Sequence, residues 1–150
     1  TCLVLSRQGL PAIERNNEQV SLISKGGYLL KSDDNPQINL IASGSEVSLA
    51  MNAAKNLNDK NISVNVASIP SVDVFERQGE EYISSVIDNS LPTIVIEASH
   101  PNSWYKFLNR NDEVIGIESF GESAPGAILL DHFGFNIENV VSKALAKINE

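Results

Sequence analysis

The alternation of apolar and polar positions along the chain predicts short strands separated by helices. The clearest unit is residues 38–47, where an apolar run is followed by a Ser/Gly turn and the start of a helix. That helix has one apolar stripe with 3.6-residue spacing, and a strand that turns tightly into a helix is typical of a β-α-β unit in a parallel sheet. We expect a capping box between Ser43 and Glu46, with Ser45 as a competing cap.

Further strands are predicted where apolar residues run continuously or alternate with polar ones, at residues 28–30, 63–67, 93–97 and 114–117. Helices are predicted at 80–88, at 127–133 and over the amphipathic C-terminal stretch, which we expect Asn136 to cap. The connection from 30 to 38 is too short for a helical crossover, so the strands it joins are either antiparallel or not adjacent. Residues 2–6 resemble a strand, and the polar stretch 12–21 is interpreted as a linker. The pattern predicts an α/β domain with a mostly parallel sheet covered on both faces.

Composition narrows the class of protein. The chain has 150 residues, 42% of them hydrophobic, and a formal net charge of −8. The acidic balance argues against nucleic-acid binding and against an anionic membrane surface, and no apolar run has the ~20 residues of a membrane span. Cys2 is the only cysteine, which favours a reducing compartment, and we expect a cytoplasmic protein. The strand-like run at Thr1 suggests a piece of a longer protein.

Three segments share their order and spacing with one enzyme family: LSRQGLP at residues 5–11, IASGSEVSLA at 41–50 and SFGESAPG at 119–126. Together they resemble the C-terminal part of transketolases. The resemblance implies a three-layer α/β/α domain with a five-stranded mixed sheet, strand order 1-3-2-4-5 and strand 1 antiparallel. It also implies that residues 1–20 are the end of the pyrimidine-binding domain and a linker, and that 21–150 are the C-terminal domain.

For the whole enzyme, the resemblance implies transfer of a two-carbon ketol unit from a ketose phosphate to an aldose phosphate in the pentose phosphate pathway. Thiamine pyrophosphate and Mg²⁺ or Ca²⁺ would be the cofactors, in a homodimer. The residues that bind them, and the catalytic residues, would lie in domains absent from this chain. We therefore expect no cofactor or metal bound to it and no turnover by it alone, with a structural and dimer-interface role.

Other functions remain open from the sequence. Deoxyxylulose-phosphate synthase and the β subunit of 2-oxoacid dehydrogenases share this type of domain. In another class, the chain could be a free-standing α/β module that binds a small ligand or another protein.

Arg7 is the strongest candidate site residue. Arg7 and its neighbours resemble the Ser-Arg-Gln stretch of transketolases, whose Arg is a ligand for the substrate phosphate. A guanidinium suits this role because it can bind two phosphate oxygens at once. The alternative is a solvated loop arginine.

A second, weaker candidate is a regulatory crevice between the carboxyl ends of strands 2 and 4. Its lining would be Ser43, Gly44 and Ser45 on one side and Ala98, Ser99 and His100 on the other. Glu46 disfavours an anion there, and a capped helix beside an empty crevice explains the same residues. No motif places a carboxylate that could orient His100. We therefore interpret His100 as a polar loop histidine rather than as the base that activates a nucleophile. Trp104 is expected in the core or at a domain interface, as are Tyr105 and Phe107.

Overall fold

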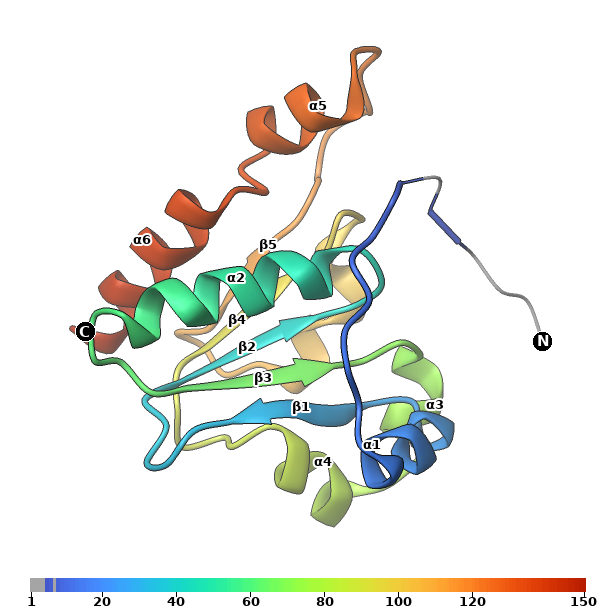
Figure 1. The fold of residues 1–150 in the computed structure, drawn as a ribbon, viewed down its shortest axis with the longest axis vertical. Coiled ribbons are helices and arrows are strands. Elements are labelled where there is room, and N and C mark those ends of the chain that lie inside the picture. Colours follow the sequence, from blue (N-terminus) through green and yellow to red (C-terminus); the bar gives the residue numbers. More distant parts are fainter. Residues whose placement is uncertain (1–4, 7) are drawn as a thin grey trace.

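The fold is built on a mixed five-stranded sheet with the order β1-β3-β2-β4-β5, seen in a computed structural model that describes residues 5–6 and 8–150 (Figure 1). β1 runs antiparallel to β3, and the other neighbouring strands are parallel. The predicted fold class, strand order and antiparallel first strand are therefore confirmed. The strands are β1 (Tyr28–Ser32), β2 (Ile38–Ala42), β3 (Val64–Ser68), β4 (Thr93–Ile96) and β5 (Glu113–Ile115).

Helices cover both faces of the sheet. α2 (Glu46–Asn58) and α6 (Ile137–Ile148) lie together on one face, and α3 (Val72–Glu76) and α4 (Glu80–Val86) lie on the other (Figure 1). The remaining helices are α1 (Asn17–Leu22), α5 (Gly126–His132) and the 3₁₀ turns η1 (Ile23–Lys25), η2 (Pro101–Ser103) and η3 (Tyr105–Phe107). None of the helices in the described ranges has both the length and the apolar character that crossing a membrane requires.

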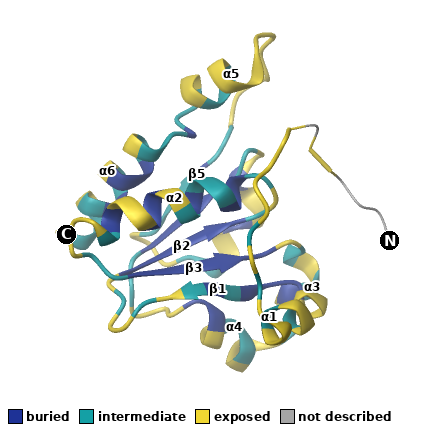
Figure 2. Cartoon of the chain, viewed as in Figure 1, coloured by how far each residue is buried: buried dark blue, intermediate teal, exposed yellow. Residues whose placement is uncertain are grey.

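β2 is the middle of the hydrophobic core. All five of its residues are buried, because helices pack on both sides of it (Figure 2). Ile38, Leu40 and Ala42 face the α2–α6 layer, while Ile41 faces the layer that contains Phe75 and Trp104. Each large apolar side chain buried in this way contributes about 1.5–3 kcal/mol relative to exposure. The central position expected for residues 38–47 is confirmed.

A ladder of polar side chains crosses four strands on the α4 side of the sheet. Ser32 Oγ donates to Asn65 Oδ1 at 2.9 Å, Asn65 Nδ2 donates to Asn39 Oδ1 at 3.4 Å, and Asn39 Nδ2 donates to Thr93 Oγ1 at 3.0 Å. Each pair is also a register pair of the sheet. Shifting one strand by a single residue would leave the buried side chains of Asn39, Asn65 and Thr93 without these partners, so the ladder holds the register.

The aromatic residues after β4 divide between core and surface. Trp104 is buried, and Phe107 packs on Phe75 with ring centroids 5.5 Å apart. Tyr105 is 52% exposed. The prediction of core placement is confirmed for Trp104.

The N-terminal region departs from the predicted linker. Residues 17–22 form α1, and its capping box joins the Asn16 side chain to Gln19 N–H and the Gln19 side chain to Asn16 N–H. Gln19 Nε2 also donates to the carbonyls of Leu29 and Leu30, at 3.2 and 2.8 Å, which ties α1 to β1. An asparagine cap three residues before a glutamine was the signal for this helix. Of the predicted strand 2–6, residues 2–4 lie outside the described residues, and Leu5 and Ser6 are exposed without regular structure.

Neither predicted side-chain cap of α2 is formed. Ser45 is the N-cap residue of α2, but its side chain makes no capping hydrogen bond. Ser43 and Glu46 form no capping box, because both side chains are engaged elsewhere. α5 begins after Pro125, and the His100 side chain caps η2. The predicted cap of α6 is confirmed, since Asn136 Oδ1 accepts from Asn139 N–H at 2.8 Å.

Candidate functional site

The carboxyl ends of β2 and β4 meet at one edge of the sheet. Ala42 and Ile96 are register partners, so the residues that follow them lie close together. Ser43 Oγ donates to Glu97 Oε2 at 2.9 Å across this edge. The contact explains why Ser43 does not cap α2, since its hydroxyl is used by the neighbouring strand. Residues at the carboxyl ends of adjacent parallel strands are a common place for ligand sites.

Glu46 brings a second carboxylate to the same edge. It is 8% exposed, and Ser45 Oγ donates to its Oε1 at 2.7 Å. Burial raises the pKa of the Glu46 carboxyl; the Ser45 hydrogen bond opposes this shift and the negative charge of Glu97 adds to it. The negative charge of Glu97 therefore acts on Glu46 at this edge of the sheet.

His100 does not join this group. Its side chain is exposed, and Nδ1 accepts from Asn102 N–H at 3.4 Å within its own turn. The Ser99 carbonyl accepts from Ile117 N–H at 3.0 Å, which directs the loop toward β5. Within the part of the chain that the structure describes, no hydrogen bond joins His100 to residues 43–45.

This edge of the sheet thus brings Ser43 and Ser45 together with Glu97, a residue that sequence reasoning did not place there. The available signal was position: Glu97 directly follows the buried run of β4 and so had to reach the same edge as Ser43. Two carboxylates that accept hydrogen bonds from hydroxyls make the crevice unfavourable for an anion. They suit a ligand that donates hydrogen bonds.

A hollow of about 210 Å³ adjoins the crevice on the β1–β3 side. Its lining includes Gly44, Ser68 and the side chains of Arg15 and Tyr28. Arg15 Nε donates to the Tyr28 hydroxyl and Arg15 Nη1 donates to the Ile13 carbonyl at 2.8 Å, so the guanidinium stabilises the turn into α1. Across the described residues, no group of three or more His, Cys, Asp or Glu side chains is placed to hold a metal ion.

Arg7, the strongest sequence candidate, lies outside the described residues. Its proposed contact with a substrate phosphate therefore stays a prediction.

Comparison with known proteins decides the family. A family model described as the transketolase-like TK C-terminal domain matches residues 26–136. The chain belongs to this family. Transketolase 1 of Vibrio parahaemolyticus is 46% identical over 146 residues, which cover 96% of this chain and 22% of that protein. Transketolase 2 of Escherichia coli is 42% identical over 146 residues, again 96% of this chain and 22% of the relative.

Solved transketolase structures confirm the fold. The Pichia stipitis transketolase in complex with sedoheptulose 7-phosphate superposes with a TM-score of 0.86 at 34% identity, covering 95% of this chain and 20% of that one. The Campylobacter jejuni transketolase gives a TM-score of 0.75 at 37% identity, covering 83% and 19%. The transketolase C-terminal domain described here thus spans about a fifth of the length of its relatives.

Proposed function

We propose that this chain is the C-terminal domain of a transketolase that transfers a two-carbon ketol unit from a ketose phosphate to an aldose phosphate. The observation that carries the proposal is the match of 96% of the chain, at 46% and 42% identity, to proteins named transketolase. Thiamine pyrophosphate and a divalent cation, Mg²⁺ or Ca²⁺, would be held by the rest of that enzyme. The cofactor supplies the carbanion chemistry, and the protein supplies binding and orientation.

Arg7 is the residue of this chain that we assign to substrate binding. A guanidinium placed at the substrate phosphate would hold it through two charge-assisted hydrogen bonds, which positions the reacting carbonyl without entering the chemistry. Residues from the other domains would complete the site. We assign no catalytic, cofactor-binding or metal-binding residue to this chain.

The domain's own role in this proposal is structural. Several large apolar side chains are exposed, including Leu5 at 81%, Phe120 at 97% and Ile128 at 61%. Phe120 lies in the loop before α5 and Ile128 lies in α5. This loop and helix project from the body of the domain (Figure 1). Exposed apolar groups of this size are typical of surfaces that contact another protein or domain. They support contact with the remaining transketolase domains and with a homodimer partner.

The proposed division of the chain places the end of the pyrimidine-binding domain and a linker at residues 1–20, and the C-terminal domain at 21–150. The family match from residue 26 supports a C-terminal domain that begins before β1. α1 crosses the proposed boundary, so the linker would enter the domain through this short helix.

The coding sequence upstream of the Thr1 codon tests the proposal against its alternatives. A transketolase requires a continuous reading frame of about 500 further residues with a thiamine diphosphate motif, the size of two large domains. A start codon next to Thr1 would instead favour a free-standing ligand-binding or interaction module. An upstream frame typical of deoxyxylulose-phosphate synthase or of a 2-oxoacid dehydrogenase β subunit would reassign the enzyme.

A further inference from the structure

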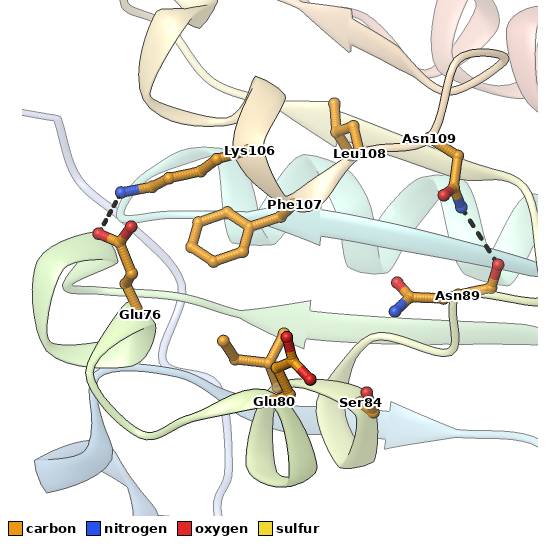
Figure 3. A pocket seen from close by; sticks show the side chains of 9 residues that line it. Glu76, Glu80, Ser84, Asn89, Lys106, Phe107, Leu108 and Asn109 are labelled. Carbon is orange, nitrogen blue, oxygen red and sulfur yellow. Dashed lines mark hydrogen bonds and ion pairs between the residues drawn. The ribbon is translucent and has the colours of Figure 1, made fainter.

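A hollow of about 520 Å³ lies on the face opposite α2 and α6, between α4 and the chain around η3 (Figure 3). Its volume falls in the range of roughly 300–1,000 Å³ that small-molecule sites occupy. α4 contributes Glu80 and Ile83 to the lining, and the segment around η3 contributes Lys106, Phe107 and Leu108. The hollow is on a different layer from the crevice between β2 and β4, so it is a separate site.

One wall of the hollow is apolar and fixed by the core. Ile83, Phe107 and Leu108 are half-buried there. Phe107 packs on buried Phe75 with centroids 5.5 Å apart, so the ring is held from behind. A preformed apolar wall of this kind can bury a short alkyl chain without reorganising the protein, which lowers the cost of binding.

The rim of the hollow is polar and also fixed. Lys106 Nζ forms an ion pair with Glu76 across one end (Figure 3). At the other end, Asn109 Nδ2 donates to the Asn89 carbonyl at 3.1 Å, which joins the η3 segment to the loop before β4. Both contacts connect the two sides of the hollow.

The charges around the hollow select the ligand. Glu76 neutralises Lys106, and Glu80 forms no ion pair or side-chain hydrogen bond with the other described residues. The Asn89 side chain likewise has its amide oxygen without a donor among them, and both side chains point toward the hollow (Figure 3). The hollow therefore offers one carboxylate without an ion-pair partner among the described residues and one amide acceptor beside an apolar wall, in a chain of net charge −8.

We propose that this hollow binds a small organic cation, a primary alkylamine whose ammonium group contacts Glu80. The three N–H donors of an ammonium fit a carboxylate and an amide oxygen, and its alkyl chain lies along Phe107 and Ile83. The site is independent of ketol transfer. It gives the domain a ligand of its own, of the class of free monoamines and diamines.

A titration of the chain with three five-carbon probes, followed by ¹H–¹⁵N correlation NMR, tests the proposal. n-Pentylamine is expected to shift the amides of residues 80–84 and 106–109 and to saturate. n-Pentanol, with the same chain and no charge, is expected to bind more weakly, and pentanoate is expected not to bind. Equal binding of pentanol, or shifts spread over the whole acidic surface, would overturn the proposal.

Two variants separate Glu80 from general negative charge. Glu80→Gln removes the proposed contact and is expected to weaken pentylamine binding about three- to fivefold, as for a partly exposed ion pair. Glu81→Gln removes the same charge from the next, exposed position of α4, which does not line the hollow, and is expected to leave affinity unchanged. The proposal fails if both variants weaken binding equally or if neither does. The NMR spectra themselves show whether each variant is folded.

Discussion

Replacing Gly26 by alanine is expected to destabilise this domain far more than the same change at Gly44. Gly26 ends η1 with φ +84°, and only Gly27 separates it from β1. A Cβ at this position would lie 2.4 Å from the Phe75 nitrogen and 2.6 Å from the Ser71 carbonyl oxygen. Both are backbone atoms of the first turn around α3, and the Ser71 N–H donates to the Gly26 carbonyl at 3.0 Å. Neither neighbour can rotate away as a side chain would.

The magnitude follows from two separate costs. A left-handed backbone costs a residue with a Cβ about 1–2 kcal/mol, and forcing an atom into a packed site costs about 1–3 kcal/mol more. Gly26→Ala should therefore lose about 3 kcal/mol of unfolding free energy. Gly44 has φ +50°, and a Cβ added there would have no atom within 4 Å, so Gly44→Ala isolates the backbone cost. That variant should lose about 1 kcal/mol.

Urea unfolding followed by circular dichroism measures both variants. At about 2–4 °C per kcal/mol, Gly26→Ala should also melt about 6–12 °C below the parent chain. If the two variants lose the same stability, the close approach of α3 to Gly26 is not what requires glycine there, and the reasoning is refuted.

Two further predictions concern the candidate sites. Because burial raises the pKa of Glu46, its contribution to stability is fully present below the ordinary value of 4.5 and is lost as the pH rises through the raised pKa. In urea unfolding, the stability of the parent chain relative to Glu46→Gln should therefore fall as the pH rises from about 4 to about 7, and a constant difference would contradict a raised pKa. In the full-length enzyme, Arg7→Leu should raise KM for a phosphorylated acceptor about 10- to 100-fold, through loss of charge-assisted hydrogen bonds, with little change in kcat. KM for an unphosphorylated acceptor should change much less. Arg110→Leu, in the exposed turn before β5, serves as the control variant. Equal changes in KM for both acceptors would exclude a phosphate contact.

Periodicity was enough to predict the layers of the fold. The apolar runs of β2, β3 and β4 are clear signals in the sequence, and so are the apolar stripes of α2 and α6. They are clear because each of these elements is buried along a continuous face. The antiparallel first strand came from the family resemblance, and the short connection before β2 allowed it.

The polar ladder could not be predicted from local pattern. Asn39 and Asn65 are of a residue type that strands disfavour, and only the pairing of strands distant in sequence shows that each side chain has a partner. The same holds for Ser43, whose local spacing indicated a helix cap while Glu97, 54 residues away, accepts its hydrogen bond. Local signals failed where a long-range partner competed for the same side chain.

A paired ketol-transfer assay tests the central claim most directly. The chain alone and its complete reading frame would be assayed with thiamine diphosphate, Mg²⁺, a ketose phosphate donor and an aldose phosphate acceptor. We expect turnover by the complete protein and no rate above the blank for the chain alone, because in the proposed function this chain supplies the accessory domain. Ketol transfer by the chain alone, or none by the complete protein, would contradict the account.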